Sequence, residues 1–108
     1  MTNVRIILCT FPDADTAAST ARQLVEEGLA ACVNLLPDIR SIYQWDGKVC
    51  DESEQLVLIK TTQQRYSDLE RRLTELHPYD TPEVLAIPVA AGSVRYLDWV
   101  GQSVQKKT

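Results

Sequence analysis

The Asp46-Gly47 dipeptide constrains the fold of this 108-residue chain more than any other feature. Extended, partly alternating sequence precedes it from 39 to 45, and a return arm follows from 48 to 61. Both central residues of a type I′ turn need positive φ, so this dipeptide predicts a tight β-hairpin. The length of the arms predicts that one end of the hairpin projects from the domain.

The segments around the hairpin predict an alternation of strands and helices. A nearly continuous β-branched run predicts a strand over 4–11, and apolar residues at helical spacing predict a helix from the N-cap Asp13 to the stop at Gly28. Further strands are predicted over 31–36, halted at Pro37-Asp38, and over 84–89; further helices are predicted over about 62–76 and, shorter, over 94–100. The order β-α-β-β-α-β predicts an α+β domain with both main helices on one face of a four-stranded antiparallel sheet.

Three strands are apolar on both sides of the pleat. The runs over 4–11, 31–36 and 56–59 do not alternate between apolar and polar residues. This is typical of strands that are buried on both faces. Two helices cover only one sheet face, and a large exposed apolar patch is a liability. We therefore expect the second face to be covered by another copy of the chain.

Composition excludes several classes of function. With 44% apolar residues the chain has material for one core, so residues 1–108 are expected to form a single domain. A net charge of -4 and a pI near 4.9 argue against nucleic-acid binding, which needs clustered Lys and Arg. The apolar run over 4–11 is too short to cross a bilayer, and no signal-peptide pattern precedes it. We expect a cytoplasmic protein with no nucleic-acid or membrane partner.

The three cysteines fit neither a disulfide framework nor a zinc ribbon. Cys9, Cys32 and Cys50 are odd in number and widely spaced, which indicates free thiols in a reducing compartment. Cys9 and Cys32 lie in apolar runs, where a free cysteine acts as a small hydrophobe, whereas Cys50 lies in a polar stretch.

The only histidine stands in a stiff polar segment, His77-Pro78-Tyr79-Asp80-Thr81-Pro82-Glu83. The two prolines fix their own φ and push the preceding residues toward extended geometry. Two interpretations stay open at this point: the segment ends a helix, or it presents His77 to a ligand.

Several motifs, in order, resemble the CutA divalent-cation tolerance family along nearly the whole chain. They are Cys9-Thr10 with Pro12-Asp13, Gly28 to Asn34, Ser41 to Trp45 with Gly47-Lys48, Glu52 and Glu54, Lys60-Thr61, His77-Pro78-Tyr79 with Pro82-Glu83, and Tyr96-Leu97 with Trp99. The resemblance implies a ferredoxin-like fold, a homotrimer similar to PII-type signalling proteins, and a cytoplasmic role in tolerance of copper and other divalent cations.

The resemblance also implies a metal site at Cys9 and His77. The family places a pair of consecutive histidines before the Pro-Tyr, but here Leu76 takes the place of the first, so one implied ligand is missing. A thiolate and an imidazole suit copper or zinc, yet a bound ion generally needs three or four donors. A neighbouring subunit could supply the rest; alternatively, Cys9 is a buried core thiol and His77 ends a helix.

A second candidate site combines aromatic, cationic and carboxylate side chains. Aromatic walls with one ammonium and several carboxylates could line a cleft between subunits that holds a small effector. The simpler interpretation is cross-strand and interface packing. The candidate cleft residues are Tyr43, Trp45, Glu52, Glu54, Lys60, Tyr79 and Glu83.

An enzymatic role finds no support in the motifs. A Cys9 and His77 nucleophile pair would need an orienting group and an oxyanion hole, and an apolar strand holds a thiol unreactive. The first functional hypothesis is metal binding in divalent-cation tolerance. The alternatives are a PII-like module with a small-molecule or protein partner at the subunit clefts, and a stable scaffold.

Overall fold

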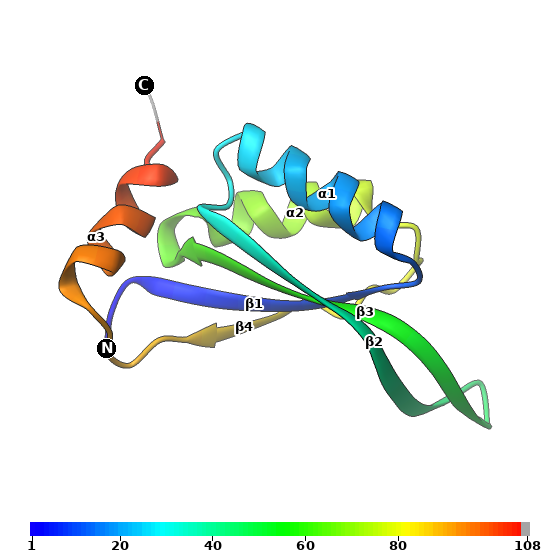
Figure 1. Cartoon of the computed structure of the whole chain (residues 1–108). Helices are drawn as coiled ribbons and strands as arrows, with labels where there is room; N and C mark the ends of the chain where they lie inside the picture. The colour runs from blue at the N-terminus through cyan, green and yellow to red at the C-terminus, as the bar shows by residue number, and fades with distance from the viewer. Residues whose placement is uncertain (107–108) are drawn as a thin grey trace.

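The computed structural model describes residues 1–106; Lys107 and Thr108, the end of the expected 1–108 domain, lie outside the described residues. Neighbouring strands run antiparallel in the order β2-β3-β1-β4, with α1 and α2 on one face of the sheet (Figure 1), so the predicted α+β class and element order are confirmed. The elements are β1 (Val4–Phe11), α1 (Ala14–Glu26), β2 (Cys32–Trp45), β3 (Lys48–Thr62), the 3-10 turn η1 (Gln63–Arg65), α2 (Tyr66–Leu76), β4 (Leu85–Pro88) and α3 (Val94–Ser103).

The hairpin turn lies where the dipeptide predicts it. Asp46 has φ 54° and Gly47 has φ 76°, the positive values that a type I′ turn requires, and Trp45 pairs with Lys48 across it. The β2-β3 hairpin runs well past the helical layer (Figure 1), and the chain is 44 Å along its longest axis. The predicted projecting hairpin is confirmed.

The predicted stop at Pro37-Asp38 is wrong, because β2 passes through it as a bulge. Leu36 pairs with Leu56 and Ile39 pairs with Glu54, so β2 spends one more residue than β3 between these two pairs. Asp38 adopts φ 57°, which an aspartate tolerates, and pairing resumes beyond it. The bulge marks the root of the projecting hairpin.

Two other boundaries differ from the prediction. The last predicted strand is shorter than 84–89, because β4 pairs with β1 only over Leu85–Pro88. The second helix begins at Tyr66 rather than near 62, because Thr62 still pairs with Val4 in the sheet and η1 intervenes. Pairing to the central strand outweighs the local helical pattern at this boundary.

The core lies between the sheet and the two helices. Ile7, Cys9 and Phe11 point from β1 toward α1 and α2 and are at most 1% exposed. Each fully buried Leu, Ile or Phe stabilises the fold by about 1.5–3 kcal/mol. The other members of this core are Ala17, Leu24, Leu29, Ala30, Val57, Ile59, Leu69 and Leu73.

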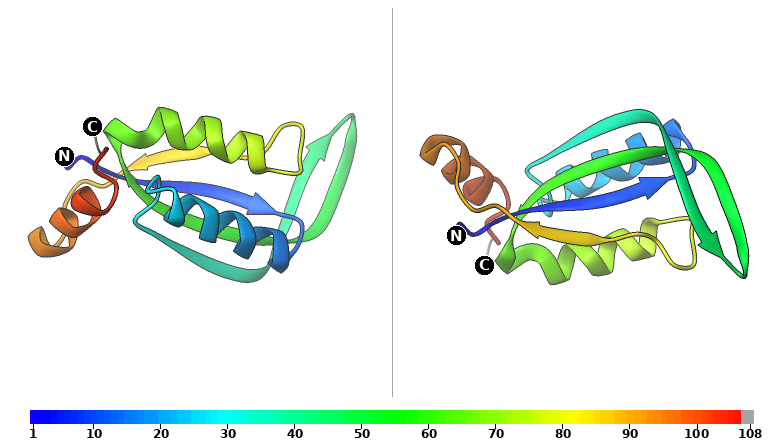
Figure 2. Two further views of the ribbon diagram at one scale, coloured as in Figure 1. Left: turned by 90° about the horizontal axis from the view of Figure 1, so that it is seen from above. Right: turned by 90° about the horizontal axis from the view of Figure 1, so that it is seen from below.

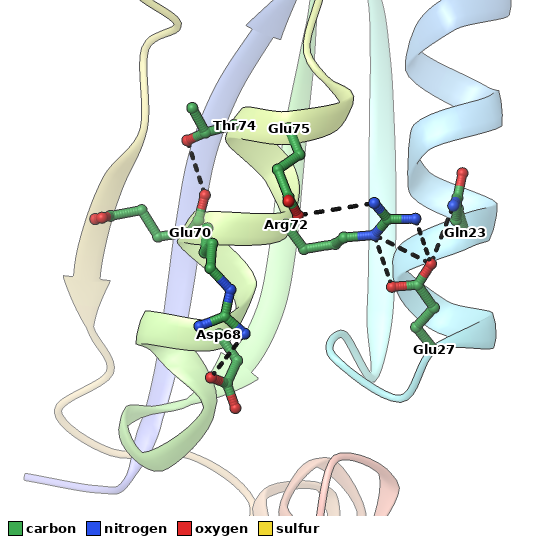
Figure 3. Close-up of polar contacts among 8 residues, drawn as sticks. Gln23, Glu27, Asp68, Glu70, Arg72, Thr74 and Glu75 are labelled. Carbon is green, nitrogen blue, oxygen red and sulfur yellow. Dashed lines mark hydrogen bonds and ion pairs between the residues drawn. The ribbon is translucent and has the colours of Figure 1, made fainter.

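An ion-pair cluster joins the outer sides of α1 and α2 (Figure 3). Arg72 donates from Nε to Glu27 Oε1 over 2.9 Å and from Nη2 to Glu27 Oε2 over 3.0 Å, and Gln23 also donates to Glu27. Hydrogen bonds from Arg72 and then Gln23 lower the pKa of the Glu27 carboxyl. Both charged side chains are about one-third exposed, so the cluster mainly sets helix alignment and contributes little stability.

The second sheet face carries no helix over its strands (Figure 2, right). Side chains alternate along each strand, so the neighbours of Ile7 and Cys9 point to this open face. Leu85 is 55% exposed, Ile87 43% and Leu36 38%. We call the apolar residues of these rows the open sheet face: Ile6, Leu8, Leu36, Leu56, Leu58, Leu85 and Ile87.

No helix within residues 1–106 is long and apolar enough to span a lipid bilayer.

Replacing Gly47 by alanine should lower the free energy of unfolding by about 1 kcal/mol, because a Cβ is strained at positive φ. The matched control is Gly101→Ala in α3, where a Cβ meets nothing within 4 Å. That substitution should stabilise by about 0.5–1 kcal/mol, since glycine weakens a helix interior. Urea unfolding at one protein concentration measures both, and equal effects of the same sign would contradict the assignment of the turn.

Candidate metal and ligand site

His77 ends α2 with both ring nitrogens engaged. Nε2 lies 2.7 Å from the carbonyl oxygen of Thr10, and Nδ1 accepts from the backbone N–H of Tyr79 over 3.1 Å. An N–H facing Nδ1 assigns the ring proton to Nε2, so His77 is a neutral donor to Thr10. The ring is 8% exposed and stacks on Phe11 with centroids 4.3 Å apart. The helix-ending interpretation is confirmed, since His77 is extended, with φ −77° and ψ 139°, before Pro78.

Cys9 lies beside the histidine as a buried thiol. Its Sγ is fully buried and lies 3.8 Å from the same Thr10 carbonyl oxygen that accepts from His77. Burial, followed by the nearby charge of Glu83, raises the pKa of the Cys9 thiol to about 12. The structure thus brings the two implied metal ligands together, with both already donating to one acceptor.

Residues 1–106 of a single chain do not complete a metal site. Leu76, in place of the implied first histidine, packs half-buried against the core and offers no donor. Within residues 1–106, no three His, Cys, Asp or Glu side chains converge closely enough to hold an ion. Coordination by Cys9 and His77 would require the thiol to ionise and the imidazole to leave Thr10. Their role as ligands stays a prediction.

Two tyrosine–glutamate hydrogen bonds lie near this histidine, one within the hairpin and one that joins the hairpin to the segment after α2. Tyr79 donates from its phenol to Glu54 over 2.9 Å, and Tyr43 donates to Glu52 over 2.7 Å. Burial, then the Glu54 hydrogen bond, raises the pKa of Tyr79; the Glu52 hydrogen bond is the main cause that raises the pKa of Tyr43. Both phenols therefore remain protonated donors. We call these four residues with Cys9 and His77 the hairpin-root cluster.

The hairpin-root cluster is negatively charged and contains no cationic side chain. Glu54 is only 7% exposed, and its negative charge acts on both Cys9 and His77. Among the ion pairs of residues 1–106, none involves Glu52, Glu54 or Glu83. A buried carboxylate with a phenol donor and no counter-ion creates a local potential that favours a cation.

Trp45 and Lys60 lie apart from the other predicted cleft residues. Trp45 is 61% exposed beside the turn at the tip of the hairpin. Lys60 lies six residues beyond Glu54 on β3, about 20 Å along an extended strand. Its ammonium contacts the Asn34 side-chain oxygen and lies 4.0 Å from Cys32 Sγ. One chain therefore brings together four of the predicted cleft residues: Tyr43, Glu52, Glu54 and Tyr79. The charge of Glu83 acts on Cys9 from nearby. A cleft of all seven residues stays a prediction that requires a second chain.

No residue type in the sequence indicates the acceptor that organises this site. The Thr10 carbonyl oxygen accepts hydrogen bonds from both Cys9 and His77. Every residue has such a main-chain oxygen, so the residue type does not indicate this role. The stacking partner Phe11 was identifiable only as a member of an apolar strand. The one sequence signal is the Cys9-Thr10-Phe11 run, which is distant from His77-Pro78 in the sequence but contacts His77 in the fold.

Protonation of His77 should destabilise the fold. Burial, partly opposed by the Thr10 hydrogen bond, lowers the pKa of His77 below its usual 6.5, so the unfolded chain takes up the proton first. Stability from the neutral ring is complete above about pH 6.5 and is lost as pH falls toward the folded pKa. The urea concentration at the midpoint of unfolding should decrease when the pH is lowered from 7.5 to 5. His77→Asn should lose this slope, because the chain has one histidine, and an unchanged slope would assign it elsewhere.

Comparisons with known proteins agree with this fold and these motifs. Residues 5–103 match the family described as CutA1 divalent ion tolerance protein. The divalent-cation tolerance protein CutA of Thermus thermophilus is 45% identical over 91% of this chain and 95% of its own, and the chloroplastic CutA of Arabidopsis thaliana is 41% identical over 93% of this chain and 55% of its own. The crystal structure of CutA from Xylella fastidiosa superposes with a TM-score of 0.94 at 39% identity, over 96% of this chain and all of that one. A match over almost the whole chain, in sequence and in structure, places this protein in the CutA1 divalent ion tolerance family.

Proposed function

We propose that this chain is a cytoplasmic homotrimer that binds a divalent cation, copper(II) included, and thereby serves divalent-cation tolerance. The observation that carries the proposal is the buried carboxylate of Glu54 in the hairpin-root cluster, which accepts from Tyr79 and forms no ion pair within residues 1–106. The tolerance described for the family supplies the class of ligand.

Glu54 is the anchoring ligand in this proposal. Its Oε2 accepts from Tyr79, which holds the carboxylate in one orientation, and Glu52 adds a second carboxylate on the same arm of the hairpin. Carboxylate oxygens suit hard and borderline divalent ions. Two carboxylates are fewer donors than an ion requires, so a neighbouring subunit completes the coordination.

Cys9 and His77 support this site rather than bind the ion directly. Both groups donate to Thr10, and coordination by either would break a buried hydrogen bond. Losing such a bond costs about 1–3 kcal/mol. The high pKa of Cys9, raised to about 12 mainly by burial, also supports a binding protein rather than an enzyme, because the neutral thiol is a poor nucleophile.

The open sheet face supports self-association. No helix covers the strands on the face opposite the helical layer (Figure 2), and exposed Leu85 and Ile87 would gain about 25 cal/mol for each Å² removed from water. The projecting hairpin adds Ile42, Trp45 and Val49, each more than 60% exposed. The number of three subunits comes from the resemblance to the family.

The cytoplasmic location rests on the cysteines. All three thiols are free, which suits a reducing compartment.

A second candidate function is a PII-like module that binds a small anionic effector. The observation that favours it is Lys60, whose ammonium forms no ion pair within residues 1–106 and lies on the face where a second subunit would pack. Bringing Lys60 of one chain toward the aromatic hairpin of another would create the predicted cleft.

Titration calorimetry with Cu(II), Zn(II), Mg(II) and ATP tests these proposals. Glu54→Gln should weaken cation binding at least about tenfold, which corresponds to 1.4 kcal/mol, while His77→Ala should bind nearly as well as the wild type. The matched carboxylate control is Glu26→Gln, on the exposed side of α1 and away from the hairpin-root cluster. Loss of binding in His77→Ala alone would assign the ion to the Cys9 and His77 pair, and saturable ATP binding without cation binding would favour the effector module.

Leu85→Asp should dissociate the trimer, because a carboxylate would be buried in the covered face. Val25→Asp is the control, since Val25 is 43% exposed on the helical layer, away from the open sheet face. Light scattering coupled to size-exclusion chromatography gives the mass of each variant, and circular dichroism checks folding. A wild-type protein that is monomeric at micromolar concentration would contradict the proposed assembly.

A further inference from the structure

Cys32 and Lys60 form a close thiol–amine pair at the end of the sheet farthest from the hairpin tip. The two residues are direct register partners on β2 and β3, so their side chains leave the same face of the sheet. Sγ and Nζ are 4.0 Å apart, and both residues are half-buried. The Asn34 side-chain oxygen contacts the same ammonium and holds it beside the sulfur.

A phenol on α3 adjoins the same thiol. Tyr96 is 44% exposed and packs against Trp99 with the rings tilted by 36° and their centroids 5.6 Å apart. Partial burial, and then the adjacent Cys32 sulfur, raises the pKa of Tyr96. The thiol therefore lies between an amine from β3 and a hydroxyl from α3.

The other two cysteines lack this arrangement. Cys9 is fully buried on the opposite face of the sheet, among the core side chains. Cys50 has the phenol-bearing Tyr43 as its register partner on β2, and lies about 30 Å along β3 from Lys60. The thiol–amine pairing is specific to Cys32.

We propose that Cys32 and Lys60 form a reversible covalent S–N cross-link when the protein meets hydrogen peroxide. The thiol first reduces the peroxide, giving the sulfenic acid Cys32–SOH and one water. The Lys60 amine, after losing a proton to solvent, attacks the sulfur, and the hydroxyl leaves with a second amine proton as water. A sulfenic acid condenses in the same way with a backbone nitrogen to give a sulfenamide. Two molecules of an external thiol reverse the reaction, restoring thiol and amine and forming one disulfide.

The position of the pair allows peroxide to reach the thiol, and it gives the cross-link an effect on the hairpin and on the charge of Lys60. Cys32 is only half-buried and lies at the start of the edge strand β2, so a molecule as small as peroxide can reach it. The bond would close a covalent loop that contains the whole hairpin and would remove the ammonium charge of Lys60 from the open side of the sheet. The inference concerns a covalent product and does not depend on the proposed trimer or cation site.

Peptide mass spectrometry tests the cross-link, and the Cys50→Ser variant is the protein to use. Trypsin releases Cys32 in the peptide 23–40, while Lys60, once blocked, remains in the peptide 49–65. Cys50 lies in that second peptide, so a Cys32–Cys50 disulfide would imitate the product unless Cys50 is removed. After treatment with hydrogen peroxide, the two peptides should be found joined, with a mass two hydrogen atoms below their sum. Dithiothreitol should separate them.

Two further variants in the Cys50→Ser background make the result decisive. Lys60→Arg should keep the oxidation of Cys32, trapped by dimedone as the sulfenic acid, and give no joined peptides. Cys32→Ser should give neither product. Dimedone labelling of Cys32 without cross-linking in the parent protein would overturn the proposal, and so would a thiol that peroxide leaves unchanged. Chromatographic mass and cation titration of the same samples report separately on the proposed function.

Discussion

The antiparallel register between β1 and β3 is the constraint on which the rest of the structure depends. It opposes Cys9 to Val57 and Ile7 to Ile59, which places one set of side chains under α1 and α2. Because side chains alternate with period 2, a slip of one residue would turn every core side chain toward the open face. The same register carries Glu54 to the root of the hairpin and Lys60 to the opposite end, and so separates the two groups of polar residues.

The Thr10 carbonyl shows how a main-chain atom can decide the chemistry of two side chains. It accepts from the Cys9 thiol and from Nε2 of His77, while the Tyr79 N–H occupies Nδ1. Burial keeps the thiol protonated and the imidazole neutral, and it outweighs the hydrogen bonds to Thr10, which shift both pKa values the other way. The residue types that suggest a soft-metal site are thus engaged in holding the end of α2 against β1. The negative charge that has no counter-ion lies nearby, on Glu54.

The two faces of the sheet differ in what covers them. The helical face buries the core, and the Arg72–Glu27 pair aligns its helices from outside (Figure 3). The other face presents apolar rows that end, at the β2 edge, in the Cys32, Asn34 and Lys60 cluster. The exposed apolar side chains and the thiol–amine pair thus lie on the same face of the sheet.

Local physics in the sequence determined the elements and their order. Asp46-Gly47 requires positive φ, Gly28 ends α1 with φ 72°, and Pro78 forces His77 out of the helix, so each of these boundaries could be predicted from residue type. The continuation of β2 through Pro37-Asp38 and the late start of α2 were decided by pairing across the sheet, which no local pattern contains. The shared acceptor at Thr10 and the approach of Lys60 to Cys32 depend on contacts between residues far apart in the chain, and only the tertiary structure decided them.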